Sequence, residues 1–223
     1  MPARTPLSLA AALAIATAPS PARTPMWELP AVAAEERLAA ETEAFEREQT
    51  LWHERYDPRS MPAYYQGDPA WAGVPYAHGG TIAGNGCGLT AAAMSLEWWT
   101  REQWTPARLA AEVGDSCTVG GLNDMVAFAG FARSLGLAAS ERYWDLERAI
   151  ADAAEGWTVW VSVSGVFGTR PYGGHIVLVW RDEAGALHVN DPACEENTRA
   201  WSAEELRRYA GSFKYAISVR KEF

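Results

Sequence analysis

Apolar residues in the first half of the chain recur at the spacing of helices. Residues 89–98, directly after Cys87, combine alanines suited to close packing with apolar positions at the helical period. A second helix is predicted to begin with Thr105 as N-cap and Pro106 at its first position, and to end near Val113. Two further helices are predicted over residues 122–135 and 145–155, each followed by a glycine that can end a helix.

The pattern changes to that of strands in the second half. Valine-rich runs at residues 157–163 and 175–180 predict strands, and a turn at 181–185 leads into a returning strand at 186–190. A short helix with a capping box is predicted over residues 202–209, followed by a last strand at 214–220. Helices first and an antiparallel sheet second predict an α+β fold of two lobes, with a cleft between them as the natural site.

The beginning of the chain divides into three segments. Residues 1–18 have one basic side chain, an apolar run and small-x-small positions, so we expect a secretory signal peptide, with an alanine-rich tail as the alternative. Residues 19–30 are proline-rich and predict a linker. Residues 31–56 predict an acidic helix packed on the body or, alternatively, docked to a partner. Residues 19–60 are therefore interpreted as linker and N-terminal helix, and residues 61–223 as the functional domain.

Charge and composition narrow the classes of function. The 223 residues have a formal net charge of −9, which argues against nucleic acid or an anionic membrane surface as the main partner. No apolar run approaches the roughly 20 residues that span a bilayer. Closely spaced Cys or His pairs are lacking, so we expect no zinc site, and we expect no cofactor and a monomer. The localisation expected is secreted or cell envelope, with the cytoplasm as the alternative.

Cys87 is the candidate nucleophile. A thiol reacts as thiolate, and the start of a helix favours negative charge through its dipole and free amides. Gly86 and Gly88 flank Cys87 and leave room for a substrate carbonyl. Taken alone, a buried inert thiol is the more common role of a single cysteine. Cys117 and Cys194 could form a disulfide in an oxidising compartment or stay free, and the sequence leaves both open.

His175 and Asp191 are the candidate base and orienting carboxylate. Centring the hairpin turn near Glu183 places His175 opposite Asp191, and opposed residues share a face with Cβ atoms roughly 5 Å apart. A slip of one residue would move Asp191 off that face. With the favourable register, the carboxylate holds one ring nitrogen while the other faces the thiol. Asn190 is the competing orienting residue.

An oxyanion hole would complete such a site. The backbone amide of Cys87 at the helix start can supply one hydrogen-bond donor. The side-chain amide of Gln66 could supply the second, although spacing alone favours a solvated loop glutamine.

Four short motifs, taken together and in order, are similar to those of a known family. They are Gln-Gly-Asp-Pro at 66–69, Gly-Cys-Gly-Leu-Thr at 86–90, Gly-His at 174–175 and Asn-Asp-Pro at 190–192. Over residues 64–223 the chain resembles the bacteriocin-processing cysteine peptidases and their stand-alone relatives, the C-thirty-nine-like peptidases. The resemblance implies a papain-like fold, in which a helical lobe with the cysteine helix packs on a C-terminal antiparallel sheet lobe.

The resemblance also implies roles for single residues. Cys87 would be the nucleophile, His175 the base, Asp191 rather than Asn190 the orienting residue, and Gln66 the oxyanion donor. The family cleaves peptide bonds, typically after paired glycines in leader peptides. Its best-known members are fused to a membrane transporter that this sequence does not show, so specificity for leader peptides does not follow.

The sequence is therefore compatible with three functions. The first is a secreted cysteine peptidase that acts on a peptide or protein through an acyl-enzyme. The second is another chemistry of the papain clan on the same triad, namely a cell-wall amidase or endopeptidase, or an acyltransferase. The third is a non-catalytic peptide-binding module with the same fold, against which the intact triad speaks.

Overall fold

The computed structural model describes residues 37–40, 42–43 and 60–222, and the chain divides into two units at residues 57 and 58. In the first unit, residues 37–40 and 42–43 are helical, and the Thr42 hydroxyl donates to the Leu38 carbonyl over 2.8 Å. Outside these residues, the helix predicted over 31–56 lies beyond the described part of the chain and stays a prediction. The predicted signal peptide and linker lie outside the described residues.

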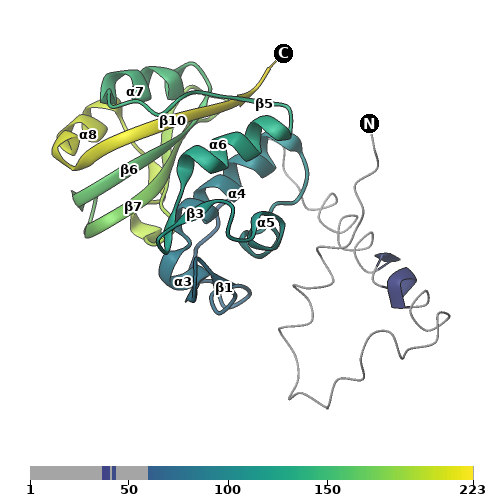
Figure 1. The fold of residues 1–223 in the computed structure, drawn as a ribbon. Coiled ribbons are helices and arrows are strands. Elements are labelled where there is room, and N and C mark those ends of the chain that lie inside the picture. Colours follow the sequence, from purple (N-terminus) through teal and green to yellow (C-terminus); the bar gives the residue numbers. More distant parts are fainter. Residues whose placement is uncertain (1–36, 41, 44–59, 223) are drawn as a thin grey trace. The chain divides into compact units, whose positions relative to one another are not determined.

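A six-stranded antiparallel sheet forms the centre of the second unit (Figure 1). Long strands in its middle are β6, β7 and β10, which pair side by side, and short strands form both edges. In spatial order the strands are β5 (Leu137–Ala139), β10 (Phe213–Lys221), β6 (Thr158–Phe167), β7 (Arg170–Arg181), β8 (Leu187–Asn190) and β9 (Arg199–Ala200).

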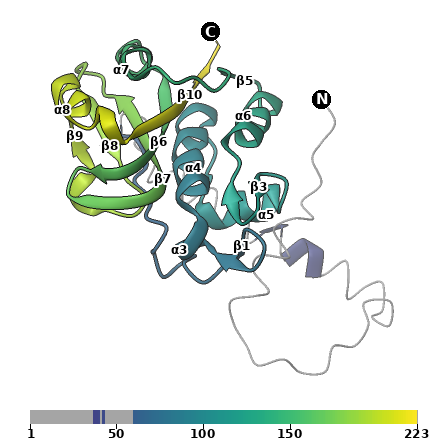
Figure 2. The same cartoon turned by 60° about the vertical axis from the view of Figure 1, so that its left-hand side comes forward.

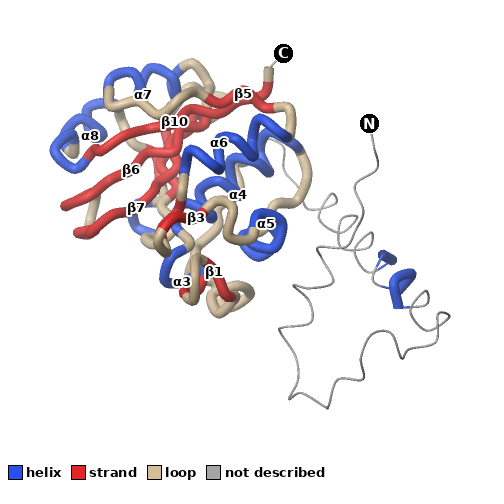
Figure 3. Tube along the Cα trace, viewed as in Figure 1, coloured by secondary structure: helices blue, strands red, loops and turns tan. Residues whose placement is uncertain are grey.

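Helices cover both faces of this sheet (Figures 1, 2 and 3). Side chains alternate along each strand, so Trp160 and Leu178 pack toward one core while Val161 and Val179 pack toward a second. Because both faces are covered, β6 and β7 have nearly continuous apolar runs. The first core contains α4 (Cys87–Thr100), α5 (Pro106–Val113) and α6 (Met125–Ser134), and the second contains α7 (Leu146–Ala154) and α8 (Ala203–Arg208).

Short elements surround the start of α4. One hairpin and one helical turn precede it, and a second hairpin precedes α6. Over residues 60–86, which are rich in proline and glycine, regular elements begin only in the second half. The elements are β1 (Pro75–Tyr76), β2 (Gly80–Thr81), α3 (Ile82–Asn85), β3 (Thr118–Val119) and β4 (Leu122–Asn123), and two 3-10 turns lie at Glu195–Asn197 and Ala210–Ser212.

The predicted starts of three helices are confirmed. Helix α4 begins at Cys87 without a side-chain cap, the Thr105 hydroxyl accepts from the Arg108 amide at the start of α5, and α8 has the predicted capping box. The helix predicted over 122–135 is wrong at its start. Gly120 and Gly121 both have positive φ and fold the chain into the β3–β4 hairpin, so α6 begins only after the Asp124 cap.

Strands β6, β7 and β10 are longer than predicted. Strand β7 starts at Arg170 and runs through the paired glycines, so His175 lies inside the strand rather than at its mouth. Helices combined with an antiparallel sheet confirm the mixed α and β class, while the papain-like arrangement of two lobes stays a prediction. In the described part of the chain, no helix is both long and apolar enough to cross a membrane.

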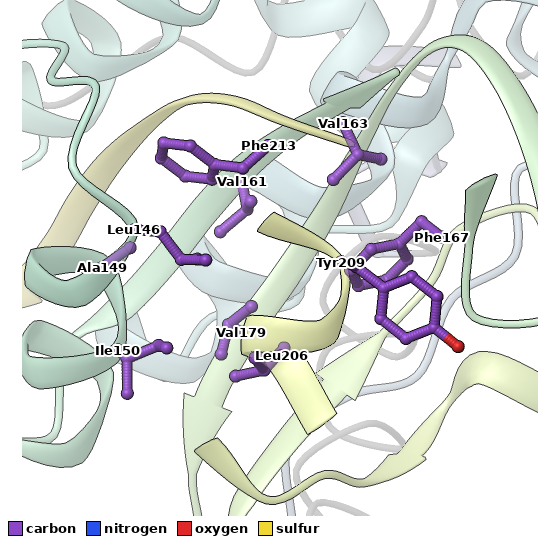
Figure 4. A pocket seen from close by; sticks show the side chains of 10 residues that line it. All are labelled: Leu146, Ala149, Ile150, Val161, Val163, Phe167, Val179, Leu206, Tyr209 and Phe213. Atoms are coloured by element: carbon purple, nitrogen blue, oxygen red, sulfur yellow. The ribbon is translucent and has the colours of Figure 1, made fainter. Parts of the chain in front are cut away.

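An apolar pocket lies under α7 and α8, on the sheet face of the second core (Figure 4). Its walls come from both helices, from β6 and β7, from Tyr209 after α8 and from Phe213 at the start of β10. They are Leu146, Ala149, Ile150, Val161, Val163, Phe167, Val179, Leu206, Tyr209 and Phe213.

Candidate active site

Cys87 is the first residue of α4 and is half-buried. At this position its sulfur lies at the positive end of the helix dipole, beside amides that have no carbonyl one turn earlier. Gly86 is required by close approach of the backbone, since a Cβ there would come within 2.5 Å of the Ile82 carbonyl oxygen. The local turn that delivers the thiol to the helix start therefore depends on glycine.

The side chain of Asn123, from strand β4, lies against the start of α4. Its Oδ1 accepts from the Leu89 amide over 3.1 Å and from the Tyr76 hydroxyl over 2.9 Å. Its Nδ2 donates to the Asn85 carbonyl over 2.7 Å and lies 3.6 Å from the Cys87 sulfur. Gly88 makes room for it, since a Cβ there would come within 2.7 Å of the Asn123 Cβ.

His175 and Asp191 form a buried pair. The ring Nε2 of His175 lies 2.7 Å from the Asp191 Oδ1, and both side chains are almost fully enclosed. The Cys87 side chain interacts with the same ring and contributes to raising the pKa of His175. Since Nε2 is held by the carboxylate, Nδ1 is the nitrogen left for the thiol. The three residues therefore meet in the order thiol, imidazole, carboxylate.

The β7–β8 hairpin, which brings His175 and Asp191 together, has a different register from the one predicted. Arg181 pairs with Leu187 and Leu178 with Asn190, so the turn is centred on Ala184 rather than Glu183. Continued by one residue, this ladder places Asp191 opposite Val177 and diagonal to His175. The shift keeps the alternation of faces, because His175 and Val177 are two residues apart. The prediction of direct opposition is therefore wrong, although the two side chains still meet.

Three other donors hold the Asp191 carboxylate. The Tyr172 hydroxyl donates to Oδ2 over 2.7 Å, the Asn197 amide to Oδ2 over 2.9 Å, and the Ala193 backbone amide to Oδ1 over 3.0 Å. The Tyr172 ring also stacks on the His175 ring, with centroids 4.2 Å apart and planes 8° apart. Tyr172 thus covers one face of the imidazole and fixes its partner.

His175 and Asp191 each shift the pKa of the other. Burial by itself would lower the pKa of His175, but hydrogen bonds to Asp191 and Cys87 outweigh it and raise that pKa to about 9. Burial would raise the pKa of Asp191, yet the hydrogen bond from His175 and its charge hold it below the ordinary value. Both directions favour an imidazolium next to a carboxylate at neutral pH.

Gln66 lies between the two halves of the site. Its backbone amide donates to the Pro192 carbonyl over 2.8 Å, directly after Asp191. Its side-chain Nε2 donates to the Ala83 carbonyl over 2.5 Å, shortly before Cys87. Its Oε1 is buried and has no hydrogen-bond partner among the described residues. A glutamine in a solvated loop would not make these two hydrogen bonds.

Comparison with protein families identifies the domain that contains this site. A family model described as "Peptidase_C39 like family" matches residues 60–219, which is well over half of the chain. The chain belongs to this family.

Two other comparisons add little to this assignment. The chain resembles the solved peptidase domain of Streptococcus ComA, described as a bifunctional ABC transporter involved in a quorum-sensing pathway. That similarity has 17% identity and a TM-score of 0.42, and it covers 61% of this chain and 91% of that domain. The comparison with curated proteins found no match.

The other candidate residues named from the sequence lie elsewhere in this C39-like domain. Asn190 accepts from the Trp180 indole over 2.9 Å and donates to the Pro62 carbonyl, so it does not hold His175. Cys117 and Cys194 are both buried free thiols, and no disulfide joins them.

Sequence reasoning missed Asn123, Tyr172 and Asn197. Asn123 was assigned to a helix, and no local motif marks its contact with a residue 36 positions earlier. Tyr172 could have been noticed as an aromatic residue three positions before His175 in a strand-forming segment. No sequence motif marked Asn197, because its hydrogen bond to Asp191 depends on the turn that follows β8.

Proposed function

We propose that this C39-like chain is a peptidase that hydrolyses peptide bonds through Cys87, His175 and Asp191. The observation that carries the proposal is the approach of a thiol and a carboxylate to the same imidazole ring. In this arrangement the ring can take the thiol proton, while the carboxylate stabilises the imidazolium that results. Family membership supports peptide-bond cleavage as the reaction class.

The reaction follows from the positions of these groups. The Cys87 thiolate attacks the peptide carbonyl carbon, and the oxyanion that forms is met by the Cys87 amide and the Gln66 side chain. The C–N bond then breaks as His175 gives its proton to the leaving amine, leaving a thioester on Cys87. Water attacks the thioester, His175 takes a proton from the water, and cleavage of the C–S bond releases the carboxylic acid product.

Replacing Cys87 by Ala tests the proposal. Peptide hydrolysis should fall by about a million-fold, because the nucleophile and its base act as a unit. Activity is measured on a pool of mixed peptides by the masses of the products. Cys117→Ala is the matched control, since it removes another buried thiol from the first core and should keep activity. Hydrolysis that persists in C87A would exclude the triad.

The same assay separates the other chemistries. Hydrolysis adds the mass of one water across the two products, whereas acyl transfer joins the acyl part to an added amine. Peptidoglycan fragments offered in parallel report amidase or endopeptidase action on the cell wall. Peptide binding without any change in mass would identify a non-catalytic binding module and contradict the proposal.

A further inference from the structure

The orientation of the Asn123 amide is fixed from one side. Oδ1 must be the atom that faces the Leu89 amide, because an N–H donor needs an acceptor there. The Tyr76 hydroxyl donates to the same oxygen, and burial keeps the pKa of Tyr76 well above its ordinary value, so the hydroxyl stays protonated. The opposite end of the amide is therefore Nδ2.

Nδ2 has two hydrogens and two neighbours. One neighbour is the Asn85 carbonyl at 2.7 Å, and the other is the Cys87 sulfur at 3.6 Å. Asn85 itself is anchored, since its side-chain amide donates to the Gly121 carbonyl in the β3–β4 turn. The absence of a Cβ on Gly88 allows the Asn123 side chain to lie this close to α4. The donor is held toward the sulfur by contacts on all sides of the amide.

We propose that Asn123 donates a hydrogen bond to the Cys87 thiolate and stabilises it, in addition to His175 and the helix start. The inference rests on the proposed function, because it assigns a role in preparing the same nucleophile. A thiolate accepts hydrogen bonds more strongly than a neutral thiol, so a fixed N–H donor increases the share of thiolate at a given pH.

A purely structural role for Asn123 predicts a different pattern of effects. In a purely structural role, Asn123 would hold β4 against α4 through its hydrogen bonds to Leu89, Tyr76 and Asn85. Loosening those bonds would then change the sulfur's reactivity whichever end of the amide is altered. A donor role acts only through Nδ2, so variants at the two ends of the amide separate the two roles.

The test compares Asn123→Asp, Asn123→Ala and Tyr76→Phe with the wild-type chain. N123D keeps an oxygen for Leu89 and Tyr76 but places an oxygen against the sulfur, whereas Y76F removes a bond only from the Oδ1 end. The measurement is the rate at which iodoacetamide alkylates Cys87 across a pH range, with the modified cysteine identified by peptide mass. The melting temperature of each variant checks that it is folded.

N123D should react with iodoacetamide at least about ten-fold more slowly at neutral pH, and its pH profile should move to higher pH. The reason is that a hydrogen bond to a charged group can change an equilibrium by about ten-fold or more. N123A should move in the same direction and serves if N123D does not fold. Y76F should keep the wild-type profile. Wild-type profiles in every folded Asn123 variant, or an equal change in Y76F, would overturn the donor role. Wild-type Cys87 reacting no faster than a small free thiol would instead sink the proposed function, and the donor role with it.

Discussion

At the scale of single residues, the Asp191 carboxylate shows how a buried charge is kept. Removing a carboxylate from water is costly unless its oxygens are paired and hydrogen-bonded. Here the His175 ring, the Tyr172 hydroxyl, the Asn197 amide and the Ala193 amide all reach its two oxygens. The carboxylate is therefore satisfied in the ionised form, which is the form that raises the pKa of His175.

Asp191→Asn tests this coupling through the pH dependence of activity. His175 is protonated below its pKa of about 9 and loses its proton as the pH rises through that value. The thiolate–imidazolium pair is lost with that proton, so peptidase activity should fall near pH 9. The substitution removes a negative charge that raises the pKa of His175, so the alkaline fall should begin at lower pH. Initial rates on a cleavable peptide over a pH series measure it.

The control for this experiment is Asp182→Asn. Asp182 pairs with His188 over 2.9 Å, as Asp191 does with His175, but the His188 ring stacks on Trp180. D182N should leave the alkaline fall where it is. An unchanged alkaline fall in D191N would contradict the coupling.

At the scale of elements, the start of α4 is defined by its neighbours as much as by its own sequence. The turn before it and the β3–β4 hairpin beside it both approach the helix at glycines. Gly88 lies where α4 comes close to its neighbours, because a Cβ there would meet the Met125 sulfur at 2.6 Å as well as the Asn123 side chain. The glycine therefore sets the distance between α4 and the start of α6.

Gly88→Ala should destabilise the domain by about 1–3 kcal/mol, because the added carbon overpacks a contact that the side chains of Met125 and Asn123 enclose. Gly130→Ala, inside α6 and exposed, has nothing within 4 Å of the new Cβ and should stabilise by about 0.4–1 kcal/mol. Urea unfolding of both variants measures the two effects. A neutral G88A would show that α4 and α6 can separate without cost.

At the scale of the whole domain, the two apolar cores are separated by the sheet. Cys87 and Asn123 belong to the side of α4, whereas Leu206 of α8 belongs to the opposite core. The pocket of Figure 4 lies within this second core. A substitution under α8, deep in the second core, should therefore lower stability without changing the reactivity of Cys87.

Leu206→Ala should lower the free energy of unfolding by about 2–5 kcal/mol, the usual cost of truncating a buried leucine. The alkylation rate of Cys87 in the folded variant should stay unchanged. Glu204→Ala on the same helix is the control, since it removes only the exposed ion pair with Arg208 and should cost a few tenths of a kcal/mol. A large loss of thiol reactivity in folded L206A would show that the two cores are coupled.

The sequence by itself determined the local features of this protein. Capping residues, glycines and the period of apolar positions predicted the starts of α4, α5 and α8, because those signals act within a few residues. Ordered motifs also singled out the four candidate residues, and they led to the family that the comparison establishes.

Only the tertiary structure decided the register of the β7–β8 hairpin and the position of Asn123 on Cys87. Turn geometry shifted the first by an amount that the apolar pattern does not specify, since alternate residues satisfy the same face. The second joins residues 36 positions apart through a hairpin whose two glycines have positive φ. Contacts of this kind depend on how elements pack, and no short stretch of sequence encodes them.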